Sequence, residues 1–293
     1  MSHFYLTLPS NSSGKYYVNT LARFKTRLPC PISLIGDWEV ALAEITFTRN
    51  WYNVHKLEGN APHAVFTCTD CPQADKDSIK FPGRKVPYTV EMRLHVGYYD
   101  SPERLIEQVQ SSMNTAFSAP VPSTTIEGKF LLIPSYHIPT IKYNPLNMKC
   151  AVSLPPNTSV RWSEDLAYIL GFSKKQHTLR NDNHDDSATF RGHNAVDVDQ
   201  LCHALFVYTD VVEATVVGDA MAQLLRIVDG GGKYDKMVHR TFDRPRYLPL
   251  QKKNFDTLEL SINTNTGALA PFESGTVVVV LHFRERKQAY FLQ

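Results

Sequence analysis

The sequence predicts a mainly β protein in which both ends of the chain form one antiparallel sandwich around an inserted α+β segment. Strand-type patterns fill residues 1–55 and 201–293, whereas the strong helix signals lie between 56 and 200. Near the C-terminus, Leu258, Leu260 and Ile262 alternate with polar residues, as in a half-buried strand. We therefore expect two domains, one formed by 1–55 with 201–293 and one formed by 56–200, each with its own hydrophobic core.

Length and composition limit the kinds of protein that this chain can be. With 293 residues, the chain can form one large β domain or two smaller ones. Its 31 basic and 29 acidic residues argue against nucleic acid as the main partner. No basic and apolar leader opens the chain and no apolar run approaches about 20 residues, so we expect neither secretion nor a membrane span. Five cysteines without a leader indicate reduced thiols inside a cell.

The N-terminal part predicts three strands. Phe4 to Leu8 forms the first, and Ala22 to Leu28 alternates until two prolines, at 29 and 31, end it. The third starts at Trp38 and runs to Phe47, with a bulge near Ala41–Ala43. Trp38 and Trp51 have two interpretations, exposed anchors for a partner or filling of the sheet core, and core filling is the more frequent use of tryptophan.

The middle part mixes strands and helices. Val90 to Val96 alternates as a strand, and Asp100 or Ser101 then caps a helix that begins at Pro102. The apolar face of this helix consists of Leu105, Ile106, Val109, Met113 and Phe117. Hairpin-like pieces follow at 129–133, 140–143 and 148–154, and a second helix runs from Ser163 to a terminal Gly171. Residues 173–199 are polar and predict a loop.

The C-terminal part returns to strands, at 205–209, 211–217, 223–228 and 237–242, before the final pair. The last strand contains Val277, Val278, Val279 and Val280 in succession. Because successive side chains alternate between faces, two of these valines must point away from the sandwich core. Exposed β-branched groups are usually covered, so we expect loops or a neighbouring subunit to cover this second face.

Several stretches resemble one protein family. They are FYLTLPSNSS and GDWEVALAEITF near the start, LLRIV at 224–228, the Tyr247-Leu-Pro-Leu segment, and LHFR at 281–284. Together they resemble the minor capsid (penton) proteins of Polinton/Maverick elements, adintoviruses and virophage-like viruses. The resemblance spans most of the chain and is weakest between 173 and 200.

The resemblance implies a jelly roll as the capsid wall, with the insertion projecting outward. It further implies a virion protein, assembled inside the host cell, that forms homopentamers at icosahedral vertices. A major capsid protein with a double jelly roll would hold each pentamer. The expected interface residues are Trp38, Trp51, Tyr52, Tyr247, Val278 and Val280. No catalytic, metal or cofactor residues are implied.

Two other classes remain open. His184 and Asp186, with a distant His239, match the ligand types of a non-haem Fe(II) oxygenase, which is also built on a jelly roll. However, NDNHDD lacks the apolar strand that would hold such ligands rigidly, so a solvated loop explains it better. The other class is a glycan-binding module with aromatic loops. We find no P-loop and no nucleophile elbow.

Two smaller patterns carry weaker hypotheses. Cys68 and Cys71 with His63 provide half of a zinc site, which normally needs two such pairs. Basic residues cluster near the end of the chain, and would form a positive rim of the domain if their strands are adjacent. This rim either makes weak contact with the genome or is simply solvated, with acidic residues between the basic ones. The rim residues are Arg240, Arg244, Arg246, Lys252, Lys253, Arg284, Arg286 and Lys287.

Overall fold

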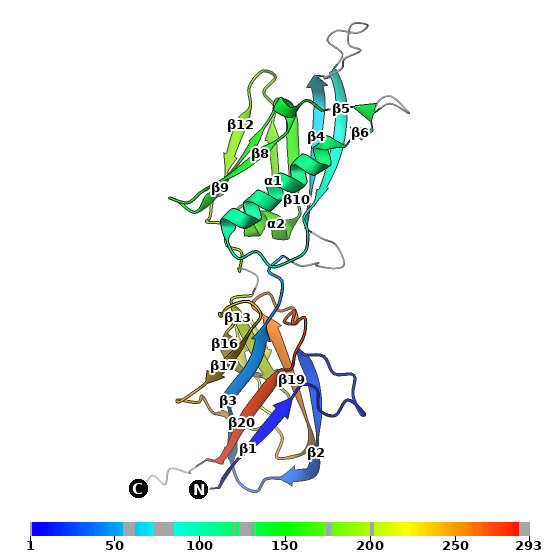
Figure 1. Ribbon diagram of the computed structural model, residues 1–293. Helices are drawn as coiled ribbons and strands as arrows, with labels where there is room; N and C mark the ends of the chain where they lie inside the picture. The colour runs from blue at the N-terminus through cyan, green and yellow to red at the C-terminus, as the bar shows by residue number, and fades with distance from the viewer. Residues whose placement is uncertain are drawn as a thin grey trace, which may run out of the picture. The chain divides into compact units, whose positions relative to one another are not determined.

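Two antiparallel sheets, one of five strands and one of four, form the sandwich of the first unit of the computed structural model (Figure 1). The structure describes residues 2–54, 62–72, 85–119, 121–122, 130–131, 133–173, 177–199 and 202–286. In the first sheet the order is β1 (His3–Pro9), β20 (Val278–Glu285), β3 (Trp38–Arg49) and β17 (Lys236–Thr241), with β18 (Leu248–Pro249) also on β3. In the second it is β16 (Leu224–Asp229), β13 (Ala204–Thr209), β19 (Asn254–Thr264) and β2 (Arg23–Ser33).

The strand order is that of a jelly roll. If these eight long strands are numbered along the chain, one sheet reads 1-8-3-6 and the other 5-4-7-2. The last strand, β20, thus lies between the first and the third, and each sheet combines strands from both ends of the chain. The predicted jelly-roll sandwich is confirmed.

The core lies between the two sheets. It contains Phe24, Phe47, Trp51 and Phe283, all at most 1% exposed, with valine or leucine from every long strand. Val280 of β20 pairs with Glu44 of β3, and the next residue, Leu281, pairs with Leu42. Ala43 is therefore left without a partner in β20, which places a bulge in β3 at the predicted position.

One predicted strand end is wrong. β2 continues to Ser33 through Pro29 and Pro31 instead of ending before them. β2 is the edge of its sheet, and its pairing with β19 skips the residues between Arg27 and Ile32. A proline there loses no ladder hydrogen bond, so the strand tolerates both.

The chain divides into two compact units, Met1–Trp51 with Leu201–Gln293, and Tyr52–Gln200. The second unit has one sheet of β11 (Thr178–Asn181), β10 (Thr158–Trp162), β4 (His63–Pro72) and β5 (Lys85–Arg93). Another contains β12 (Ala188–Arg191), β9 (Lys149–Leu154) and β8 (Thr140–Asn144). Short pieces complete it: β6 (Val121–Pro122), β7 (Phe130–Leu131) and the 3-10 turn η1 (Ser135–His137).

Both helices of the second unit begin and end as the sequence predicts. Helix α1 (Pro102–Ser118) has Ser101 as its N-cap, and the five apolar residues of the predicted face are its buried ones. Helix α2 (Glu164–Ile169) is followed by Gly171 at φ +82°. A Cβ on this glycine would lie 2.3 Å from the backbone oxygen of Asn194, so only glycine fits there.

The predicted loop at 173–199 is wrong in part, because β11 and β12 lie within it. Both are edge strands, which have one sheet neighbour each and therefore tolerate many polar side chains. The amide of Asn181, at the end of β11, donates to the carbonyls of Leu154, Pro155 and Asp186 and fixes the following turn.

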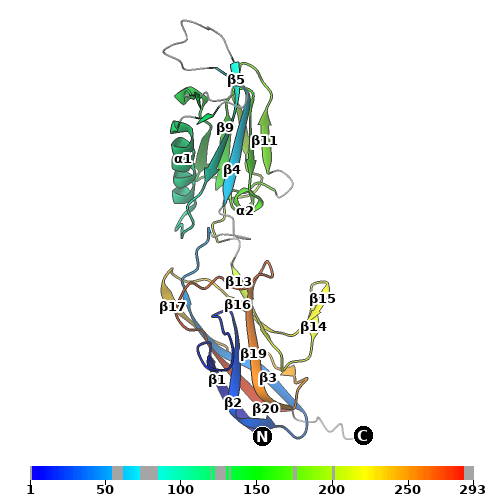
Figure 2. The same cartoon turned by 90° about the vertical axis from the view of Figure 1, so that its right-hand side faces the viewer.

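The predicted strand at 211–217 also differs. Val212 forms one isolated bridge with Leu250, and the chain then leaves the sandwich as a hairpin of β14 (Thr215–Val217) and β15 (Ala220–Ala222). In Figure 2 this hairpin stands clear of both sheets.

Candidate subunit interface

The outer face of the β1–β20–β3–β17 sheet carries the valines that the sequence singled out. Val277 and Val279 are 2% and 0% exposed in the core, whereas Val278 and Val280 face outward and are partly exposed. On the same face, Tyr5 of β1 is 56% exposed and Met237 of β17 is 75% exposed. The face is therefore apolar at several points without a cover from the described part of the chain.

A cluster of rings lies beside these valines, around His282 of β20. The ring of Tyr5 stacks on His282 with 4.2 Å between centroids, and the hydroxyl of Tyr247 lies 2.8 Å from its Nδ1. His282 Nε2 lies 3.2 Å from Nδ1 of His3. A neutral His282 can accept from Tyr247 and donate to His3, which satisfies both ring nitrogens.

Charge borders this cluster on one side. Nε of Arg284 lies 2.5 Å from Oε1 of Glu39, and its guanidinium lies 3.4 Å from the centroid of the Tyr247 ring. Partial burial, followed by the charges of His3 and Arg284, lowers the pKa of His282 below its ordinary value. The neutral imidazole is therefore the favoured form.

The expected interface residues do not form one surface. Tyr247, Val278 and Val280 share the outer face of this sheet. Trp38 is partly buried against the core, and its indole donates to Ile35 at 2.9 Å. Trp51 is 1% exposed in the core, which matches the core-filling interpretation and leaves almost no side-chain surface for a partner. Tyr52 belongs to the second unit and is partly exposed.

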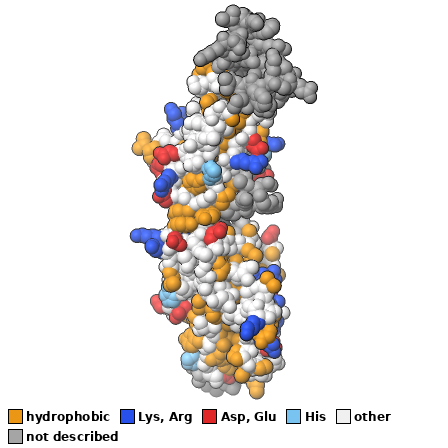
Figure 3. Space-filling view, turned by 45° about the vertical axis from the view of Figure 1, so that its right-hand side comes forward, with side chains coloured by type: hydrophobic (Ala, Val, Ile, Leu, Met, Phe, Trp, Pro, Cys, Tyr) orange, Lys and Arg blue, Asp and Glu red, His pale blue; other side chains and the backbone are white. Residues whose placement is uncertain are grey.

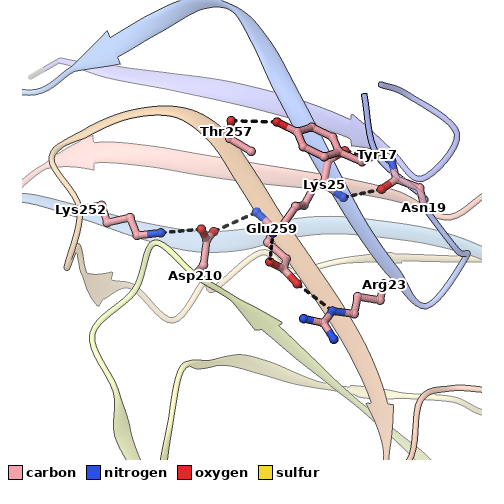
Figure 4. A network of polar contacts seen from close by, with 8 residues as sticks. All are labelled: Tyr17, Asn19, Arg23, Lys25, Asp210, Lys252, Thr257 and Glu259. Carbon is pink, nitrogen blue, oxygen red and sulfur yellow. Dashed lines mark hydrogen bonds and ion pairs between the residues drawn. The ribbon is translucent and has the colours of Figure 1, made fainter. Parts of the chain in front are cut away.

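The outer face of the second sheet is polar (Figure 4). Glu259 of β19 receives Arg23 at 2.7 Å and Lys25 at 2.9 Å, both from the edge strand β2. Burial alone would raise the pKa of Glu259, but the hydrogen bonds and charges of Lys25 and Arg23 hold it below its ordinary range. The hydrogen bond to Glu259 in turn raises the pKa of Lys25.

This polar network continues to the end of β13. Asp210 accepts from the backbone N–H of Glu259 at 2.9 Å and pairs with Lys252 at 2.6 Å. At the other end, the Asn19 side chain binds the backbone of Lys25 in both directions, at 2.9 Å each. The network thus ties the loop before β2 to β19 and to the end of β13, across the sheet.

Two hollows flank β2. One, of about 340 Å³, lies between the loop before β2, Arg23, Lys25, Glu259 and Leu269. The other, of about 450 Å³, is lined by Tyr16, Arg27, Leu28, Pro29, Pro31 and Asp256. The second unit has a hollow of about 570 Å³ between α1 and β8, with Ile106, Ile141 and Tyr143 among its lining residues. Concave surfaces of this size accept side chains of a partner.

Four of the eight rim cations form ion pairs within the chain. Arg240 pairs with Asp229, Lys252 with Asp210, Lys253 with Asp37, and Arg284 with Glu39. In Figure 3, Lys and Arg side chains are interspersed with hydrophobic ones on the face in view. Paired cations attract phosphates weakly, which favours the solvated rim over genome contact. Lys287 lies outside the described residues.

The iron hypothesis finds no support in the geometry. His184 and Asp186 lie in an exposed turn of the second unit, whereas His239 lies on β17 of the first. Both ring nitrogens of His239 contact threonine hydroxyls, Thr46 at 2.8 Å and Thr241 at 3.0 Å. Across the described residues, no three His, Cys, Asp or Glu side chains gather as metal ligands.

The zinc hypothesis stays open. Cys68 is buried, with its Sγ 3.4 Å from Nε2 of the buried His137, a neighbour that the sequence did not suggest. The side chain of Cys71 lies outside the described residues. Cys30 and Cys150 are free thiols. Burial raises the pKa of Cys150 to about 12, so this thiol stays protonated and donates to the Leu170 carbonyl.

Sequence reasoning missed the partners of His282 because they come from distant parts of the chain. His3, Tyr5 and Glu39 meet His282 and Arg284 only through the pairing of β20 with β1 and β3. Alternation within β20 would have placed His282 on the same face as Val278 and Val280. Among the described residues, no helix has the length and apolar character needed to cross a bilayer.

Comparison with known proteins gives matches among solved structures alone. The chain matches no protein-family model and no curated protein. It is similar to the mavirus penton protein, with a TM-score of 0.45 and 10% identity over 97% of this chain and 99% of that one. It is also similar to a chain in the structure of the Sputnik virophage, with a TM-score of 0.43 and 11% identity over 96% and 97%.

Proposed function

We propose that this chain is a structural protein of a virus capsid, the minor capsid (penton) protein of a Polinton-like, adintovirus-like or virophage-like element. Five copies form a ring at the icosahedral vertex, held by a major capsid protein with a double jelly roll. The protein acts in the virion, assembles inside the host cell and has no catalytic role. Contact with the genome is weak, since four of the eight rim cations are already paired.

The observation that carries this proposal is the outer face of the β1–β20–β3–β17 sheet. Val278 and Val280 with Tyr5 and Met237 offer apolar area, and the Tyr247–His282 pair offers polar contacts with defined directions. Apolar anchors surrounded by polar groups are typical of a protein interface. The resemblance of the sequence to penton proteins and the jelly-roll topology support the same proposal independently of this face.

The mechanism is geometric. A ring closes when one surface of a subunit fits a different surface of the next and the rotation between them divides a full turn. The insertion between the third and fourth long strands leaves both jelly-roll sheets complete, so it can project from the ring without interrupting the wall.

Electron microscopy of the purified protein tests the proposal. Negative-stain class averages should show rings with five-fold symmetry. Single separated particles at micromolar concentration, with stoichiometric bound iron by elemental analysis, would favour the oxygenase hypothesis instead.

A further inference from the structure

The β14–β15 hairpin is an apolar projection from a polar surface. We define the arm as residues 213–222. Val216 and Met221 lie opposite each other in the hairpin register and are 75% and 65% exposed. Two-stranded hairpins are marginally stable alone in water. An exposed apolar pair in the middle of a projecting hairpin (Figure 2) is therefore suited to insertion into a partner.

The base of the arm is firmly attached. Gln223 donates from Nε2 to the Val212 carbonyl at 2.8 Å and to the Gln251 side chain at 2.7 Å. The N–H of Glu213 donates to the Pro249 carbonyl at 3.1 Å. Val212 is fully buried beneath these contacts. A projection held at its base loses little conformational entropy when it binds, which favours association.

The hollow of about 340 Å³ beside β2, named here the β2 hollow, has matching chemistry. Of its apolar lining, Val18 is 101% exposed and Leu269 is 46% exposed. Its charged lining is Arg23, Lys25 and Glu259, which sums to one positive charge. The arm carries Glu213 and Asp219 and no basic residue. Both surfaces thus combine exposed apolar side chains with opposite net charge.

The two surfaces also lie at opposite edges of the second sheet. The arm joins β13 to β16, an edge strand of the second sheet, and β2 is the opposite edge of that sheet. A head-to-tail contact needs two different surfaces of this kind. We propose that the arm of one copy of this chain seats in the β2 hollow of the next copy, with Val216 and Met221 against Val18 and Leu269. This inference rests on the proposed pentamer and adds a contact to the one proposed at the outer face of the β1–β20–β3–β17 sheet.

Paired variants test the contact in the full-length protein. The arm variant is Val216→Asp with Met221→Asp, and the hollow variant is Val18→Asp with Leu269→Asp. The matched control is Leu146→Asp, at a side chain that is 95% exposed in the second unit. All changed side chains are exposed, so each variant should keep the circular dichroism spectrum of the folded wild-type chain. Light scattering after size exclusion should show wild type and control as pentamers, and each double variant as a monomer, with at least roughly tenfold weaker association.

A mixture of the two double variants provides the decisive observation. The arm variant keeps its hollow and the hollow variant keeps its arm, so the mixture should give heterodimers through one intact contact and no rings. A wild-type pentamer whose arm variant also remains a pentamer would overturn this inference and leave the proposed function standing. A wild-type monomer would overturn the proposed function, and the arm contact with it.

Discussion

Nε2 of His282 and Nδ1 of His3 lie 3.2 Å apart on the outer face of the β1–β20–β3–β17 sheet, although the two residues are 279 positions apart in the chain. One hydrogen can be shared between these nitrogens, but two protonated rings would repel each other. We therefore expect the stability of the jelly-roll unit to depend on pH.

The first prediction concerns that sensitivity. The folded-state pKa of His282 is lowered by burial, His3 and Arg284, whereas the unfolded chain binds the proton near the ordinary value of about 6.5. The stabilisation is therefore full above the unfolded pKa and is lost as the pH falls toward the folded pKa. Thermal melting between about pH 7.5 and about pH 5.5 should show a larger loss for wild type than for His282→Gln. An equal loss in both proteins would contradict this, and His184→Gln, in an exposed turn, is the control.

A second prediction uses the alternation along β20. Val277→Thr with Val279→Thr should lower the free energy of unfolding by about 1–3 kcal/mol for each hydroxyl placed in the core. Val278→Thr with Val280→Thr should leave monomer stability nearly unchanged, because these side chains are partly exposed. Under the proposed function the outward pair should weaken assembly. Denaturant titration and light scattering measure the two effects, and equal destabilisation by both pairs would show that both faces belong to one core.

A third prediction tests the start of helix α1. The Ser101 hydroxyl accepts from the backbone N–H of Arg104 at 3.3 Å, so Ser101→Ala should cost about 1 kcal/mol of stability in urea titration. Ser111→Ala in the helix interior is the matched control and should be neutral or slightly stabilising, because alanine is the better helix former. The same effect from both changes would mean that Ser101 does not act as a cap.

A fourth prediction concerns the two units. Replacing residues 56–200 by a short Gly/Ser linker should leave a β-rich remainder that unfolds cooperatively, because loop length adds little closure entropy. Circular dichroism during heating is the measurement. A remainder without a cooperative transition would show that the jelly roll needs the insertion for its core.

Local sequence patterns predict the helices and the alternation within strands, but they do not predict which strands pair with each other. Ser101, Pro102 and the apolar spacing predict helix α1 because helix contacts are local. Alternation likewise divides Val277 and Val279 from Val278 and Val280.

Pairing supplies the rest. Strand order places β2 at the edge of its sheet, and this position permits Pro29 and Pro31 within the strand. The pairing of β1 with β20 likewise brings His3 next to His282. β11 and β12 are polar because they are edge strands, and a polar edge strand has the composition of a loop. The burial of Trp51 likewise depends on the packing of the two sheets, which alternation in one segment does not specify.

Native mass spectrometry of the full-length protein tests the central claim most directly. We predict one dominant species at five times the 33.2 kDa chain mass, because a closed ring leaves no free surface for further growth. A monomer at micromolar concentration, or a ladder of open oligomers without a limit at five, would contradict the assignment as a penton.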